Sequence, residues 1–284
     1  MDYIDLHVHS NASDGTLTPT EVVERAIQNG LSAFALTDHD TIDGVKEAMA
    51  AAKIATAAGK PIRVIAGTEI SAEYKHRDIH ILGLFINHEK KEFGEFLNRA
   101  KLGRVNRNKK MVQNLRDAGL DITLEDMLKE NEDAVITRAH FAKQLVAIGA
   151  VKTKEDAFRR YLDSNTPYYV PREFFTPEEA IQMIHNAGGI ASLAHPLLYK
   201  LTRSEVEKLV VYLKSFGLDA LETYYSSHTE ADEYFVRNLA RKQGLKMTGG
   251  SDFHGANKPD IELGSGRGRL KIPASLLDTL DPAL

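Results

Sequence analysis

Residues 3–15 read YIDLHVHSNASDG, an apolar stretch that ends in two histidines one residue apart. Side chains of an extended chain alternate between its two sides, so His7 and His9 point to the same side and can bind one metal ion. Asp14 follows His9 closely and offers a carboxylate near the same point. The stretch therefore predicts a β-strand, residues 3–8, that ends at a metal site.

Six more short segments, rich in Ile, Val, Leu and Phe, follow along the chain and predict further strands. They span residues 33–37, 63–69, 78–85, 190–194, 220–225 and 246–250. Most are separated by stretches with helical periodicity. In TPTEVVERAIQNG, Thr18 is the expected N-cap, Pro19 opens the helix and Glu21 completes a capping box. The segment FTPEEAIQMIHNAGG repeats this signal with Thr176 and Glu179.

Alternating strands and helices predict an α/β barrel with a parallel sheet inside and helices outside. Residues 95–169 break the alternation, because they show amphipathic helical patterns and no convincing strand. We therefore expect a barrel domain of residues 1–94 and 170–284 that carries the metal site. A small helical insertion domain, residues 95–169, is expected to cover the substrate.

The composition excludes several classes of protein. The 284 residues contain no cysteine, so disulfides, thiolate metal sites and cysteine nucleophiles are excluded. No stretch approaches the roughly 18 apolar residues of a membrane span, and no cleavable leader precedes Ile4, so we expect a cytoplasmic protein with no membrane association. The net charge of -4 gives no general attraction to nucleic acid, so a polyanionic ligand needs a local source of positive charge.

Histidines and acidic residues gather at or near the ends of the predicted strands. A single histidine there is usually an ordinary hydrogen-bonding residue, but this set is larger. The carboxyl ends of parallel strands meet at one mouth of a barrel, so side chains far apart in sequence converge there. The candidate metal ligands are His7, His9, Asp14, His39, Glu69, His80, His195, Asp252 and His254.

Six segments resemble, in order, the motifs of the PHP (polymerase and histidinol phosphatase) superfamily. They are DLHVHSNASDGTLTP, ALTDHDT, AGTEIS, DIHILG, AHP and GGSDFHG. More narrowly, they are similar to those of the nucleoside 3',5'-bisphosphate phosphatases. The resemblance spans nearly the whole chain and implies a distorted seven-stranded (β/α)7 barrel of the PHP fold with two to three divalent metal ions.

The resemblance also implies how the ligands divide among the ions. His7, His9, Glu69 and Asp252 would hold the first ion, and Glu69 would bridge to a second ion held by His80 and His195. Asp14, His39 and His254 would hold the third, and some relatives carry a histidine in the place of Asp14. Mixed nitrogen and oxygen donors suit manganese, which we expect first, or iron or zinc better than magnesium.

Three divalent ions bring about six positive charges against three carboxylates, which would leave the mouth of the barrel cationic. A phosphate can bridge such ions, and a metal-bound water whose pKa has fallen toward neutrality becomes the hydroxide that attacks phosphorus. No protein nucleophile is then needed. His7, His9, Glu69 and Asp252 form the expected catalytic set.

The insertion offers candidate substrate-binding residues, because the planar guanidinium of arginine matches phosphate oxygens. Arg104 and Arg107 share a helix face in KLGRVNRNKKM, and Arg138 and His140 open another helix in ITRAH. A solvated basic helix face is the alternative for Arg104. Asp14 and His228 join this set, and His228 is also the candidate proton donor.

We expect three further side chains near the predicted ligands. Tyr225 follows the sixth strand, as His228 does, and would face the same mouth. Asp5 and Asp38 lie beside the ligand motifs, either as acceptors for the imidazoles or as caps of the strand ends.

We therefore expect a metal-dependent phosphoesterase that hydrolyses the 3'-phosphate of nucleoside 3',5'-bisphosphates to the 5'-monophosphate and phosphate. A 5'-3' exonuclease on short RNA or DNA oligonucleotides and a general phosphomonoester phosphatase are alternatives. A metal-dependent amidohydrolase, a histidinol phosphatase and a non-catalytic module rank below them. The expected partner is a small phosphorylated nucleotide or a short oligonucleotide, with no obligate protein partner.

Overall fold

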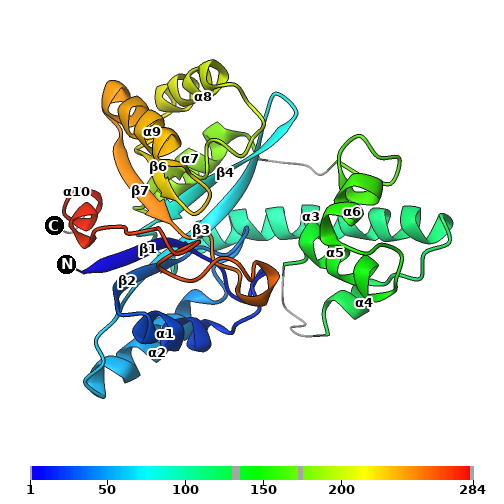
Figure 1. Cartoon of the computed structure of the whole chain (residues 1–284), viewed down its shortest axis with the longest axis horizontal. Helices are drawn as coiled ribbons and strands as arrows, with labels where there is room; N and C mark the ends of the chain where they lie inside the picture. Colours follow the sequence, from blue (N-terminus) through cyan, green and yellow to red (C-terminus); the bar gives the residue numbers. More distant parts are fainter. Residues whose placement is uncertain (1, 130–134, 172–174, 282–284) are drawn as a thin grey trace.

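The computed structural model describes residues 2–129, 135–171 and 175–281. Its seven strands form one sheet in sequence order that curls into a nearly closed barrel (Figure 1). The strands are β1 (Tyr3–Val8), β2 (Leu31–Leu36), β3 (Arg63–Tyr74), β4 (Arg77–Leu84), β5 (Ile190–Leu193), β6 (Ala220–Tyr225) and β7 (Lys246–Gly250). Directly after β7 the chain runs parallel to the end of β1, where the main-chain N–H of Asp252 donates to the carbonyl of His7. The predicted seven-stranded α/β barrel is confirmed.

The expectation that every strand runs parallel is wrong for β4, which is antiparallel to both β3 and β5. The reason is a hairpin: β3 continues five residues beyond Glu69 and turns directly into β4. Lys75 and His76 form the turn with φ of 49° and 61°, the positive values that two-residue hairpins prefer. Glu69 therefore lies within β3, not at its end.

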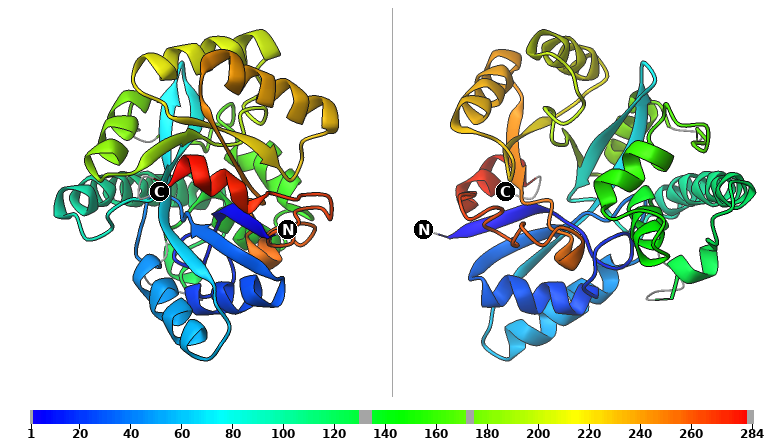
Figure 2. Two further views of the ribbon diagram at one scale, coloured as in Figure 1. Left: turned by 90° about the vertical axis from the view of Figure 1, so that its left-hand side faces the viewer. Right: turned by 45° about the vertical axis from the view of Figure 1, so that its right-hand side comes forward.

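Helices cover the outside of the sheet. They are α1 (Pro19–Gln28), α2 (Val45–Ala57), α7 (Pro177–Asn186), α8 (Arg203–Ser215) and α9 (Glu230–Gln243). The capping boxes predicted at Thr18 and Thr176 are both present. A short last helix, α10 (Leu277–Leu280), packs Leu277 and Leu280 against the apolar cluster that contains Ile4 and Leu6, and the left view of Figure 2 shows it beside the barrel strands.

The helical insertion lies to one side of the barrel (Figure 1). It contains α3 (Lys91–Asp117), α4 (Leu124–Met127), α5 (Arg138–Ala147), α6 (Lys154–Ala157) and a π-helical turn, η1 (Phe158–Leu162). Met111 and Phe141 belong to an apolar cluster of the insertion that is separate from the main core, which supports our proposal that the insertion unit spans residues 95–169. The first turns of α3 join this unit to the barrel, because Phe93 and Phe96 pack into the main core. Among the described residues, no helix combines the length and apolar character needed to cross a membrane.

Candidate metal centre

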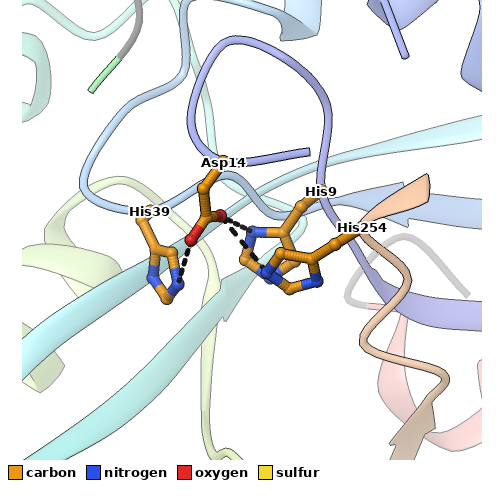
Figure 3. A group of neighbouring side chains, drawn as sticks. All are labelled: His9, Asp14, His39 and His254. Atoms are coloured by element: carbon orange, nitrogen blue, oxygen red, sulfur yellow. Dashed lines mark ion pairs between the residues drawn. The ribbon is translucent and has the colours of Figure 1, made fainter. Parts of the chain in front are cut away.

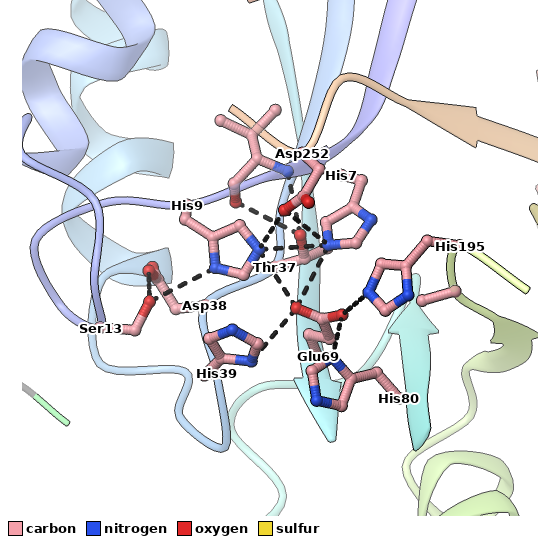
Figure 4. A network of polar contacts seen from close by, with 12 residues as sticks. His7, His9, Ser13, Thr37, Asp38, His39, Glu69, His80, His195 and Asp252 are labelled. Carbon is pink, nitrogen blue, oxygen red and sulfur yellow. Dashed lines mark hydrogen bonds and ion pairs between the residues drawn. The ribbon is translucent and has the colours of Figure 1, made fainter. Parts of the chain in front are cut away.

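The structure brings all nine predicted ligand residues to one end of the barrel, and Figure 4 shows most of them around Glu69. His7 is the last residue but one of β1 and His9 directly follows the strand. His39, His195, Asp252 and His254 lie in loops that follow strands. His80 lies at the same end of the barrel, although it belongs to the first half of its strand. Because β4 is antiparallel, its beginning lies at this end, and His80 pairs with Ser71 of β3.

Glu69 lies at the centre of the cluster and is 1% exposed. Its Oε2 lies 3.2 Å from Nε2 of His7, 3.2 Å from Nε2 of His9 and 3.1 Å from Nδ1 of His39. Its Oε1 faces the other side, 2.8 Å from Nδ1 of His80 and 2.9 Å from Nε2 of His195. Each carboxylate oxygen thus faces its own group of imidazoles, the arrangement that a carboxylate bridging two ions requires.

A second group surrounds Asp14 (Figure 3). Oδ1 of Asp14 lies 3.2 Å from Nε2 of His254 and 3.7 Å from Nδ1 of His9, and Oδ2 lies 3.9 Å from Nε2 of His39. The family resemblance implied a group of Asp14, His39 and His254, and the structure adds His9 to it. The two nitrogens of His9 face different groups, since its Nε2 points to Glu69 and Asp252.

The donor set fits divalent metal ions. His7 Nε2 and His9 Nε2 lie only 3.1 Å apart, a spacing that two imidazole nitrogens tolerate when they share a proton or face a common cation. The donors are imidazole nitrogens and carboxylate oxygens, and thiolates are excluded because the chain lacks cysteine. Such a set is typical of manganese, iron or zinc sites.

Without metal, the cluster holds protons unevenly. Burial disfavours ionisation of Asp14, but His254 and His39 hold its pKa well below the usual range. Burial likewise opposes protonation of His9, yet Asp252 and Glu69 raise its pKa to about 9. For His39 burial dominates and lowers the pKa to about 3. The metal-free cluster therefore contains both protonated and neutral imidazoles.

Two residues that the sequence analysis missed support this cluster. Glu222, within β6, is 0% exposed and accepts from the main-chain N–H of His195 at 2.6 Å. Its other oxygen lies 3.0 Å from Nδ1 of His7. Lys258 donates to Oδ2 of Asp252 at 2.6 Å, and Tyr225 donates to the same oxygen at 2.7 Å. The sequence signal for Glu222 was a lone acidic residue in the apolar segment ALETYY.

Asp5 and Asp38, considered either as acceptors for imidazoles or as strand-end caps, support the backbone and the loops. Asp5 accepts main-chain N–H groups of His7, Ser251 and Gly264. Asp38 accepts from the hydroxyl and main-chain N–H of Ser10 and from the Ser13 hydroxyl. Ser13 in turn lies 3.4 Å from Nδ1 of His9, so Asp38 reaches an imidazole only indirectly.

A cavity of about 180 Å³ joins the cluster to the insertion. The lining comprises Asp14, His39, Asp78, His80, Arg104, Arg107, Thr137, Arg138, Ala139, Phe158 and Tyr169. The hydroxyl of Thr137, the N-cap of α5, donates to Oδ2 of Asp14 at 3.0 Å. The insertion therefore contacts one of the predicted ligands directly.

The three predicted arginines all line this cavity, but their surroundings differ. Arg104 donates through Nε to Asp40 Oδ2 at 2.6 Å and through a terminal nitrogen to the Ser71 hydroxyl at 2.9 Å. Arg107 is 5% exposed. Arg138 is more accessible, and its guanidinium carbon lies 5.9 Å from the Phe158 ring centre and 5.7 Å from that of Tyr169.

Two predicted residues lie elsewhere. His140 accepts the main-chain N–H of Thr137 through Nδ1 at 3.1 Å, which completes the capping box of α5, and it lines a different cavity. His228 places Nδ1 3.1 Å from the Thr223 carbonyl, and its ring centre lies 5.5 Å from that of Tyr225. Burial lowers its pKa. Neither histidine lines the cavity beside the metal cluster.

The chain is similar to known proteins over most of its length. A model of the PHP domain matches residues 5–216. A 5'-3' exoribonuclease of Haemophilus influenzae is 40% identical over 250 residues, which cover 88% of this chain and 89% of that protein. A 3',5'-nucleoside bisphosphate phosphatase of Chromobacterium violaceum is 36% identical over 266 residues, or 93% and 91% of the two chains.

A solved structure shows that the likeness extends to the fold. A protein from Chromobacterium violaceum, described as an amidohydrolase with bound sulfate and no metal, superimposes with a TM-score of 0.85 at 35% identity. The match covers 96% of this chain and 92% of that one. The barrel and the insertion are therefore both features of the solved relative.

Proposed function

The chain belongs to the PHP domain family of phosphoesterases, and from that premise we propose that it removes the 3'-phosphate of nucleoside 3',5'-bisphosphates. The observation that carries the proposal is the shared cavity. Its lining combines three residues of the ligand cluster, Asp14, His39 and His80, with Arg107 and Arg138 of the insertion. The ligand cluster suits the phosphate that is cleaved, and the arginines suit a second phosphate.

We propose the ligand division that the family resemblance implies, in which His9 would hold the first ion together with His7, Glu69 and Asp252. Bound divalent ions would neutralise the phosphate and lower the pKa of a water molecule for attack on phosphorus. Manganese is the first ion to test, with iron and zinc as alternatives, because the donors mix imidazole and carboxylate. Glu69, with its two oxygens directed at separate imidazole groups, is the proposed bridge.

The reaction breaks one bond. Water adds to the 3'-phosphorus, the bond from phosphorus to O3' breaks, and O3' leaves with a proton as the 3'-hydroxyl. Protein side chains have two tasks in this scheme. Arg138, whose guanidinium lies near the Phe158 and Tyr169 rings and 3.5 Å from Asp78, would bind the 5'-phosphate that is retained. His228 remains our candidate for the proton donor, although its contacts place it beside Tyr225 and outside the cavity.

A 5'-3' exoribonuclease is the second candidate, favoured by the relative from Haemophilus influenzae. Release of a 5'-mononucleotide from an RNA end breaks the same bond between phosphorus and O3', so one site can serve both substrates. Three hydrogen bonds join the insertion to the barrel. Thr137 donates to Asp14, Arg104 donates to Asp40, and Lys154 donates to the carbonyl of Asn257. These contacts favour a small substrate over a long strand.

The amidohydrolase alternative has less support. The solved relative so described carries sulfate, a tetrahedral dianion that resembles phosphate. Arg107 and Arg138 in the lining of the cavity, the latter 3.5 Å from Asp78, also suit a phosphate better than a neutral amide. We therefore place phosphoester hydrolysis first.

Steady-state kinetics on three substrates test the proposal. They are a nucleoside 3',5'-bisphosphate, the matching 3'-monophosphate, and a short oligoribonucleotide with a 5'-phosphate. We expect the bisphosphate to give the highest kcat/KM, because its second phosphate gains a charge-assisted contact worth about 1.5–3 kcal/mol, or roughly 10- to 100-fold. A higher value for the oligonucleotide would favour the exoribonuclease, and equal values for both mononucleotides would contradict recognition of the 5'-phosphate.

A further inference from the structure

We propose that Glu222 is a positioning residue that fixes the ring of His7 and the backbone of His195, and so sets the affinity of the centre for its metal ions. The proposal rests on the metal centre of the proposed function. Glu222 itself lies behind the ligands. Its contacts lead to Nδ1 of His7, the nitrogen that faces away from Glu69, and to the main chain of His195.

The first part of the argument concerns the tautomer of His7. Nε2 of His7 points into the cluster, 3.2 Å from Glu69 Oε2 and 3.6 Å from Asp252 Oδ1. Nδ1 lies 3.0 Å from Glu222 Oε1. A carboxylate accepts and cannot donate, so it holds the ring with hydrogen on Nδ1 and leaves the lone pair of Nε2 for a cation. Hydrogen bonds of this kind make an imidazole a stronger ligand.

The second part concerns His195. Its backbone has φ of 25°, in a region that residues other than glycine rarely adopt. The main-chain N–H donates to Glu222 Oε2 at 2.6 Å, and this bond helps to hold the unusual conformation. The same backbone directs the ring so that Nε2 lies 2.9 Å from Glu69 Oε1. One carboxylate thus orients a ligand on each side of Glu69.

The third part concerns the location of the charge. Glu222 is 0% exposed, and His7 is its only ion-pair partner among the described side chains. A buried carboxylate is costly unless it is hydrogen-bonded and compensated by positive charge. Here the positive charge comes from the His7 imidazole when it is protonated, or from metal ions bound on the far side of that ring. A purely structural position in the core of β6 would be filled as well by an apolar residue.

Glu222→Gln tests the inference, because an amide has one accepting oxygen and one donating nitrogen. It cannot accept both from His7 and from the main-chain N–H of His195. We expect the metal affinity, measured by competition with a chromophoric chelator, to fall by about 10- to 100-fold. Equal affinity in a folded Glu222→Gln protein would overturn the inference.

Asp219→Asn is the matched control. Oδ2 of Asp219 also accepts from an imidazole, that of His185 at 2.8 Å, and from a main-chain N–H, that of Ala191 at 2.8 Å. Asp219→Asn makes the same change from carboxylate to amide at a residue that contacts none of the proposed metal ligands. We expect unchanged metal affinity. An equal loss in both variants would mean that general damage to the fold explains the effect, and it would also overturn the inference.

A measurement on the unchanged protein covers the case in which Glu222→Gln does not fold. Nitrogen-15 NMR of the zinc-loaded protein reports the tautomer of each histidine. We expect His7 to carry hydrogen on Nδ1 in a hydrogen bond that exchanges slowly with solvent, and hydrogen on Nε2 would refute the role of Glu222. If the unchanged protein binds no metal at all, it is the proposed function that fails.

Discussion

Arg104 of helix α3 and Asp40, which follows the predicted ligand His39, form a buried ion pair with Nε and Oδ2 2.6 Å apart. The side chains are 7% and 0% exposed. Asp40 has φ of 51°, and its Oδ1 accepts the main-chain N–H of Ser71. The pair therefore ties the insertion to the loop that carries His39.

We predict that Arg104→Ala lowers the free energy of unfolding by about 3 kcal/mol, because it removes the positive charge that compensates the buried carboxylate of Asp40. Urea denaturation of the metal-loaded protein measures this. Lys101→Ala is the control: Lys101 lies one turn earlier on α3 and pairs with exposed Asp43 at 3.2 Å. This exposed pair should contribute at most about 1 kcal/mol. Equal losses in the two variants would contradict a special role for the buried pair.

Glu69→Gln should abolish the bridge between the proposed ions. A neutral amide binds two cations poorly, and its NH2 group would face imidazole nitrogens that now surround a carboxylate oxygen at 2.8–2.9 Å. We expect fewer bound ions in elemental analysis and a loss of turnover greater than the roughly 10- to 100-fold that an outer carboxylate contributes. Glu73→Gln, on the same strand but paired with exposed His76, should leave both unchanged. Normal turnover by folded Glu69→Gln protein would exclude the bridge.

Arg138→Gln should raise KM for a nucleoside 3',5'-bisphosphate and change KM for the 3'-monophosphate little. The reason is that the proposed contact of Arg138 is with the 5'-phosphate, which the monophosphate lacks. Loss of such a charge-assisted contact corresponds to about 10- to 100-fold. Arg159→Gln is the control, since Arg159 lies in the same insertion and is exposed beside Asp156. Equal effects of Arg138→Gln on the two substrates would argue against this role.

The sequence predicted the barrel well because its signals are local. The capping boxes at Thr18 and Thr176 and the apolar strand segments depend on residues close together in the chain. The direction of β4 was not predictable in this way. Its hairpin turns at Lys75 and His76, which lack the Asn-Gly or Asp-Gly signature that announces such turns. His80 lies within the fourth strand, and it was assigned as a ligand through the family resemblance and not through its position at a strand end.

The side chains around the cluster were harder to predict, because their roles depend on contacts between distant segments. Glu222 meets His7 across 215 positions of sequence, and no local pattern reveals such a pairing. Arg104 was expected to bind phosphate, and its buried partner Asp40 appears only when α3 is packed on the barrel. The residue types indicated polar, functional groups, but the partners of these groups can be identified only from the folded structure.

Metal uptake should release protons. Burial opposes protonation of His80, but Glu69 and Asp78 raise its pKa to about 10, and Asp252 and Glu69 raise that of His9 to about 9. Both imidazoles are thus protonated at pH 7 in the metal-free protein, whereas a bound ion requires the neutral ring. Protons compete with the ion below these pKa values, so metal affinity should rise as the pH increases from 7 toward 9.

Calorimetric titration with manganese in two buffers of different ionisation enthalpy measures this release. Burial also opposes protonation of His7, but Glu69 and Glu222 raise its pKa well above the usual value, so we expect the release of at least two protons at pH 7. His76→Gln is the control, because the side chain of His76 is 97% exposed and pairs with Glu73 instead of a ligand of the cluster. It should release the same number of protons as the unchanged protein. Binding heats that do not depend on the buffer would show that His9 and His80 are already neutral, and the charge distribution derived for the metal-free cluster would then be wrong.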